Sequence, residues 1–150
     1  MSEPIHFTIY GEPVAQGRPR AGKIQRGRLR GKTILYDPEE SRDYKTYLKL
    51  AASQQAPEKP LEGPLQLVVH IYRSMPKRFS KKKKAAAEAG EIRPTTKPDA
   101  DNYLKGVSDA LNKIIWQDDS QIVSATVEKW YSEQPRIEVI VTKLTEGEIA

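Results

Sequence analysis

Apolar and polar residues alternate in four segments of the chain, and a period of two predicts β-strands. The first covers residues 6–10 and the clearest covers residues 65–72, a β-branched run bounded by prolines. Residues 121–131 and 136–144 alternate on either side of a Glu-Gln-Pro turn. We expect these last two segments to pair as a hairpin.

A helical period appears in two longer segments. Residues 39–54 repeat apolar side chains at helical spacing, which is typical of plain packing. Residues 101–114 give the strongest helix prediction, because their apolar positions share one arc and their polar positions the other. A shorter basic helix is expected after Ser80, as its N-cap, ending at Gly90.

The predicted order is strand, helix, strand, helix, helix, strand, strand. This order favours a single α+β domain with one mixed β-sheet packed against helices. Residues 17–34 are rich in glycine and basic residues, and we expect a mobile basic loop or a ragged hairpin there. Residues 145–150 are expected to form a frayed tail.

Composition excludes several kinds of site. The 150 residues include no cysteine, so disulfides, thiolate zinc sites and cysteine nucleophiles are absent. With two histidines in the chain, a histidine-rich metal site is not expected either. No apolar run approaches the roughly 18 residues of a membrane helix, and the N-terminus shows no secretory pattern.

The positive charge is concentrated in two blocks. The net charge is +5, and the first block, in residues 17–34, has seven basic residues and no acidic one. They are Arg18, Arg20, Lys23, Arg26, Arg28, Arg30 and Lys32. The second block spans residues 77–84. Such blocks suit phosphate contacts that weaken with salt, although solvated loops that keep the protein soluble are the alternative.

Carboxylates cluster between residues 99 and 119. They are Asp99, Asp101, Asp109, Asp118 and Asp119. Two or three oxygen ligands suffice for magnesium, which keeps several waters. In an extended segment Asp99 and Asp101 would project to the same side. The alternative for Asp101 is a helix N-cap, which leaves Asp99 without a role.

Lys105 follows Asp101 by one helical turn. An ordinary salt bridge is one interpretation; the other is stabilisation of charge at a scissile phosphate. Asp109 is more suited to holding Lys105, or to supporting the ligands, than to binding metal. Asp118 and Asp119 are alone typical of a turn. A short return of the chain would bring them back to the helix start, where they would supply a third metal ligand.

These residues resemble the RusA family of Holliday junction resolvases. The resemblance is carried by DADNYLKGVSDALN and WQDDSQI, and the GEPVAQGRPR and SKKKKAAAEAGEIRPTTKPD segments are similar to prophage members. It implies an endonuclease that nicks four-way DNA junctions symmetrically as a homodimer. Magnesium is the implied cofactor, with manganese as a substitute, and no small-molecule cofactor or membrane is involved. A bacterial cytoplasmic, nucleoid-associated protein is expected.

The resemblance also implies roles for individual residues. Asp99, Asp101 and Asp119 correspond to the catalytic, metal-binding aspartates, Lys105 to the essential lysine, and Asp118 is a substitute for Asp119. We expect DNA contacts from Arg18, Arg20, Lys81, Lys82 and Lys97. The alternatives are a metal-dependent nuclease for other branched DNA and a non-catalytic DNA-binding module. Trp116 is expected to pack beneath the acidic loop, with base stacking as the alternative, and Tyr36 is similar.

Overall fold

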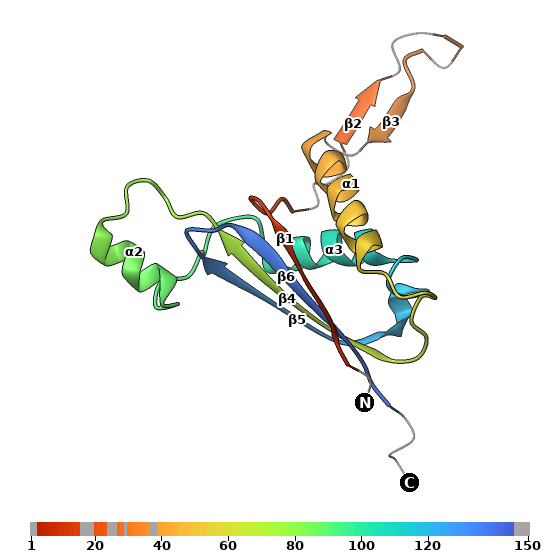
Figure 1. Cartoon of the computed structure of the whole chain (residues 1–150). Coiled ribbons are helices and arrows are strands. Elements are labelled where there is room, and N and C mark those ends of the chain that lie inside the picture. The colour runs from red at the N-terminus through yellow and green to blue at the C-terminus, as the bar shows by residue number, and fades with distance from the viewer. Residues whose placement is uncertain (1–2, 16–19, 24–26, 29, 37–38, 146–150) are drawn as a thin grey trace.

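The main sheet has four strands in the order β1-β6-β4-β5 (Figure 1). The computed structural model describes residues 3–15, 20–23, 27–28, 30–36 and 39–145. The strands of this sheet are β1 (Ile5–Tyr10), β4 (Leu65–Arg73), β5 (Ile122–Tyr131) and β6 (Arg136–Lys143). β4 pairs parallel with β5 and antiparallel with β6, so the sheet is mixed, as predicted.

Within the described residues three α-helices accompany the sheet: α1 (Glu39–Gln54), α2 (Lys81–Glu88) and α3 (Ala100–Leu111). A 3₁₀ turn, η1 (Asp119–Gln121), precedes β5, and β2 (Arg20–Lys23) pairs with β3 (Thr33–Tyr36) as a separate antiparallel hairpin. Of the two expectations for the basic segment, a mobile loop or a ragged hairpin, the described residues therefore fit the hairpin. The α+β prediction is also confirmed. No helix in the described ranges is long and apolar enough to cross a membrane.

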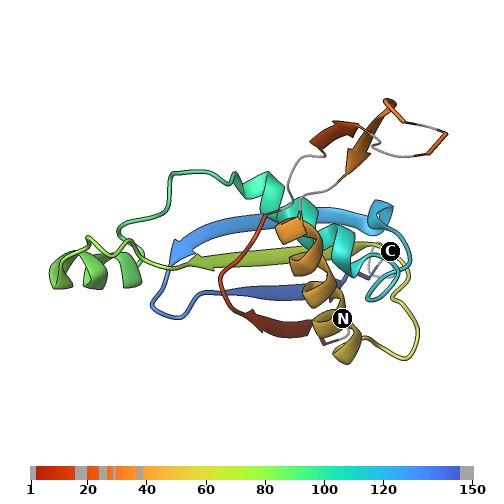
Figure 2. The same cartoon turned by 90° about the horizontal axis from the view of Figure 1, so that it is seen from above.

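The core lies between one face of the sheet and the pair α1 and α3 (Figure 2). Alternate residues of β4 are fully buried, and those of β6 face the same way. Residues that fill this layer include Leu67, Val69, Val139, Leu48 and Val107. α2 contributes Ala87 to the buried residues and lies at one end of the sheet, where the strands β4 and β5 finish.

The predicted hairpin of β5 with β6 is wrong. Both strands exist, but β4 lies between them and pairs with each. Alternation along a strand identifies its two faces, whereas it carries no information about its neighbours. Every second residue of β4 is buried. Because β4 pairs on both edges, this apolar strand lies inside the sheet and not at its edge. Its connection to β5 is therefore a parallel crossover that contains α2 and α3.

Candidate functional site

Asp99 and Asp101 lie at the start of α3. Asp99 is the N-cap, with extended backbone angles, and its side chain makes no capping hydrogen bond. The alternative interpretation of Asp101 as the N-cap is wrong, because α3 begins at Ala100 and Asp101 is in its first turn. Both carboxylates are exposed. They are therefore free to bind a cation beside the positive end of the helix.

Two basic side chains support the segment that leads into Asp99. The Lys129 ammonium donates to the Thr96 carbonyl at 2.9 Å and to the Pro98 carbonyl at 3.0 Å. Arg73 also donates to the Thr96 carbonyl, at 3.1 Å. Burial lowers the pKa of Lys129, Arg73 lowers it further, and the Asp99 carboxylate opposes the shift. The backbone before Asp99 is thus held to the end of β5.

Sequence reasoning did not single out Lys129. In the register of the sheet Lys129 is opposite Ile71, whose side chain is fully buried. A lysine on the inward face of a strand is unusual, because burying an ammonium without acceptors is costly. The inward position of Lys129 could have indicated its role. It could be recognised only once β4 was known to pair with β5.

Lys105 is exposed one turn after Asp101. In the part of the chain that the structure describes, neither Asp101 nor Asp109 is within ion-pair distance of its ammonium. The expectation that Asp109 holds Lys105 is wrong, since Asp109 pairs with Lys45 of α1 at 3.9 Å. That pair links α1 to α3, and the Lys105 ammonium is left facing solvent.

Asp118 has a local structural role at the other end of α3. Its side chain accepts from the Ser120 amide at 3.0 Å, while its own amide donates to the Gln121 side chain at 2.8 Å. These bonds form a capping box for η1. The Ser120 hydroxyl and amide lower the pKa of the Asp118 carboxyl, and Lys113, 3.7 Å away, adds to this effect.

Asp119 is held by the indole of Trp116, whose Nε1 donates to Oδ1 at 2.8 Å. Trp116 is fully buried, as expected for a packing residue, so base stacking would require it to leave the core. The second Asp119 oxygen has no hydrogen bond within the described ranges. The side chain of Tyr36 lies outside the described residues.

The two groups of carboxylates are at opposite ends of α3. The helix has 12 residues, which corresponds to a length of about 18 Å. No group of three metal-binding side chains forms within the described part of one chain. The expected return of Asp118 and Asp119 to the helix start is therefore wrong. In a parallel crossover the helix runs opposite to the strands, so a residue just before β5 lies at the far end of α3.

The predicted DNA-contact residues are distributed as follows. Lys97 is exposed beside Asp99, and Lys81 and Lys82 are exposed in the first turn of α2. Arg18 and the side chain of Arg20 lie outside the described residues.

α2 is docked on the end of β5. Its Glu88 accepts from the Ser132 hydroxyl at 3.3 Å and from the Glu133 amide at 3.1 Å. Phe79, just before the helix, contacts Tyr131 edge-to-face. These contacts hold the basic first turn of α2 at the end of the sheet. The segment before Asp99 is attached to the same end.

Comparison with known proteins places these residues in a family. The family model described as "Endodeoxyribonuclease RusA" matches residues 10–142. A relative from Bacillus subtilis (strain 168), "Uncharacterized protein YqaN", is 53% identical over 143 residues, which cover 94% of this chain and 97% of the relative. The "Crossover junction endodeoxyribonuclease rusA" of Lactococcus phage r1t is 30% identical over 120 residues, covering 78% and 83%. The chain therefore belongs to the RusA endodeoxyribonuclease family.

Proposed function

We propose that this protein is a metal-dependent endonuclease that resolves four-way DNA junctions by paired nicks, acting as a two-fold dimer. The observation that carries the proposal is the pair of exposed carboxylates at the start of α3, with the free Lys105 ammonium one turn later. Family membership supports the nuclease activity. A two-fold dimer suits a junction, which offers two equivalent strands for cutting.

The residues present fit a magnesium or manganese ion. Asp99 and Asp101 offer hard oxygen ligands that the helix amides do not occupy, and magnesium needs one or two carboxylates beside phosphate oxygens and water. When bound, such an ion lowers the pKa of the attacking water and neutralises charge on the phosphate. Lys105 has the reach and the free charge to stabilise the transition state beside it.

The third carboxylate, in this proposal, comes from a second copy of the chain. Asp119 lies about one helix length from Asp99, too far for two short side chains to share an ion. Two copies placed antiparallel about a two-fold axis would bring the end of one α3 beside the start of the other. Asp119 suits this role better than Asp118, because one Asp118 oxygen accepts from Ser120 and the other pairs with Lys113.

The DNA path in this proposal follows the basic residues near the active carboxylates. Lys97 is beside Asp99, and Lys81 and Lys82 are on α2 at the end of β5. Arg18 and Arg20 are further DNA contacts in this proposal, on the strength of their charge. Binding should be salt-dependent, and each lysine that contacts a phosphate should contribute about one unit to the salt slope.

The test is cleavage of a mobile four-way junction beside linear duplex and a flap, with and without magnesium. Wild type should nick opposing strands of the junction, whereas Asp99→Asn should bind without cutting. Asp43→Asn removes the same charge from the exposed face of α1 and should cut normally. Cutting of flap or duplex alone would assign a different nuclease, and binding without cutting under every metal would favour a non-catalytic module.

The shared site is tested by mixing two inactive chains. Asp99→Asn and Asp119→Asn chains are refolded together in equal amounts. If the site is shared, each mixed dimer has one intact site, so random pairing should restore about a quarter of the wild-type sites. These dimers should give single nicks rather than paired ones. A site formed within one chain predicts no activity from any mixture, and that result would refute the sharing.

A further inference from the structure

Among the described strands β1 lies at the edge of the main sheet, and its outer backbone groups can be identified from the register. β1 pairs antiparallel with β6, and the Gly11 amide donates to the Pro135 carbonyl at 3.1 Å just beyond the paired strands. In an antiparallel ladder hydrogen-bonded pairs alternate with pairs whose groups point away. Phe7 and Ile9 therefore bond to β6, whereas His6, Thr8 and Tyr10 direct their N–H and C=O groups outward.

Two independent hydrogen bonds agree with this assignment. The Tyr47 hydroxyl of α1 donates to the Tyr10 carbonyl at 2.9 Å, which requires that carbonyl to face away from β6. On β6, Ile137 and Val139 are then bonded to β1, and the residues that alternate with them must bond to β4. The Leu144 amide, in continuation of that set, donates to the Pro64 carbonyl beside β4 at 2.9 Å.

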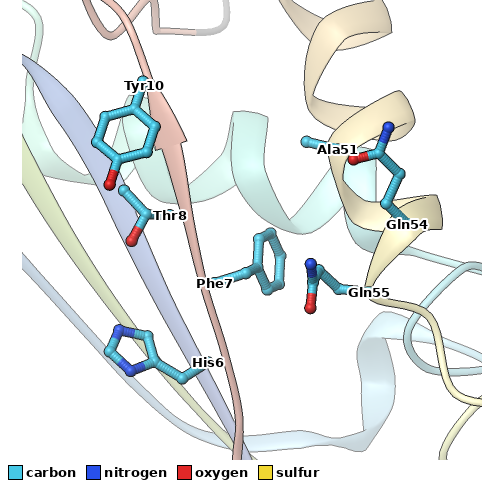
Figure 3. Close-up of a pocket in the computed structure, with 7 residues that line it drawn as sticks. All are labelled: His6, Phe7, Thr8, Tyr10, Ala51, Gln54 and Gln55. Carbon is cyan, nitrogen blue, oxygen red and sulfur yellow. The ribbon is translucent and has the colours of Figure 1, made fainter.

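A groove of about 370 Å³ runs along this outer edge (Figure 3). It is lined by His6, Phe7, Thr8 and Tyr10 on β1, by Ala51 and Gln54 on α1 and by Gln55 just after that helix, and we call it the β1 groove. In Figure 3, His6, Thr8 and Tyr10 lie on one side of the strand and Phe7 points to the other, toward Gln55. None of these residues is acidic, a lysine or an arginine.

Exposed apolar side chains gather beside the groove. Among the described residues the large hydrophobic side chains that are most exposed are Tyr10, Tyr47, Leu50 and Val123. The first three of these lie on β1 and α1, and Leu50 is 61% exposed. Such a concentration of apolar surface next to a free strand edge is typical of a protein interface.

β1 also lacks the features that prevent an exposed edge strand from pairing with another chain. Its sequence IHFTIY has high β-propensity and contains no lysine, proline or acidic residue. Natural proteins usually protect an exposed edge with charge, proline or a covering segment. We propose that the β1 groove binds an extended, uncharged segment of a partner protein, which adds to the sheet as a fifth strand next to β1.

Other occupants fit less well. Nucleic acid would need lysine or arginine side chains along the groove, and its lining contains neither. Pairing of a second copy through β1 conflicts with the proposed nuclease dimer. This exclusion, unlike the others, depends on the proposed function. That dimer joins copies near α3, and a further two-fold contact through β1 would build an assembly larger than a dimer. A peptide strand uses the free backbone groups and ends the sheet.

The first test uses an eight-residue peptide of alternating valine and threonine, blocked at both ends. In the free protein the amides of His6 and Thr8 should exchange with solvent much faster than those of Phe7 and Ile9. The peptide should slow exchange at His6 and Thr8 and shift their NMR signals until they saturate. Unchanged exchange and shifts at millimolar peptide would refute the proposal.

A pair of variants separates backbone pairing from side-chain effects. Thr8→Pro removes an outward N–H, which an edge strand tolerates, and should weaken peptide binding about tenfold or more. Thr8→Val keeps that N–H and should bind as wild type does. Protected Phe7 and Ile9 amides in both variants would show that β1 is intact. Equal binding by Thr8→Pro would contradict the pairing.

The same samples test whether a second copy occupies the β1 groove. They also separate a failure of this proposal from a failure of the proposed function. A growth in particle mass without peptide, with protection of His6 and Thr8, would assign the β1 groove to a second copy and overturn the proposal. Junction cleavage is measured separately and does not use Thr8. Loss of cleavage with intact peptide binding would therefore count against the nuclease proposal alone, and the reverse result against the β1 groove alone.

Discussion

Trp116 offers the sharpest test of how this fold positions a candidate ligand. Its indole is fully buried and donates to Asp119 at 2.8 Å. Trp116→Phe removes the donor and leaves a small cavity. A hydrogen bond to a half-exposed carboxylate contributes about 1 kcal/mol, and the lost ring atoms about 1–2 kcal/mol. The free energy of unfolding should therefore fall by roughly 2–3 kcal/mol.

Urea unfolding measures this loss. With a slope of about 2 kcal/mol per molar urea, the midpoint should fall by about 1–1.5 M. Protein concentration is held constant in all samples, because dimer formation would make stability depend on it. The expected midpoint shift alone does not separate the hydrogen bond from the packing.

A double-mutant cycle makes that separation. In an Asp119→Ala background the indole has no carboxylate to donate to, so Trp116→Phe should cost about 1 kcal/mol less than in wild type. Additive effects, within about 0.5 kcal/mol, would show that the hydrogen bond contributes nothing and would refute the positioning of Asp119 by Trp116.

Three further predictions concern single groups. Ser120→Ala should raise the pKa of Asp118 toward its ordinary value, which an NMR titration would follow; an unchanged pKa would contradict the bonds from Ser120. Tyr44→Phe should stabilise by about 1 kcal/mol, because the buried Tyr44 hydroxyl has no hydrogen-bond partner in the described part of the chain. Burial also raises the pKa of Tyr44, so wild-type stability should fall above about pH 10, where the unfolded phenol ionises first, and the variant should lose less there. Gly90→Ala should destabilise by more than 1 kcal/mol in thermal unfolding, since φ is 84° and the new Cβ would lie 2.7 Å from Trp130; Glu91→Ala is a control expected to change little.

Local sequence determined most of the elements. The spacing of apolar residues predicted α1 at residues 39–54, the bounds at which it is found, and β4 to within one residue. The polar arc of α3 also followed from its sequence, since a helix must turn such residues to water. Helix ends were less certain: α3 stops at Leu111, three residues early, where the chain turns toward Trp116.

Strand neighbours and distances between motifs depended on the tertiary structure. Alternation fixes which residues of a strand face the core, but pairing is a contact between distant segments, so β4 between β5 and β6 was not predictable from either strand. The parallel crossover that follows places Asp119 a helix length from Asp99 and puts Lys129 beneath the Asp99 segment. The sequence by itself therefore determined which carboxylates are available, because charge and period are local properties. Only the packing of the sheet decided which of them can meet within one chain.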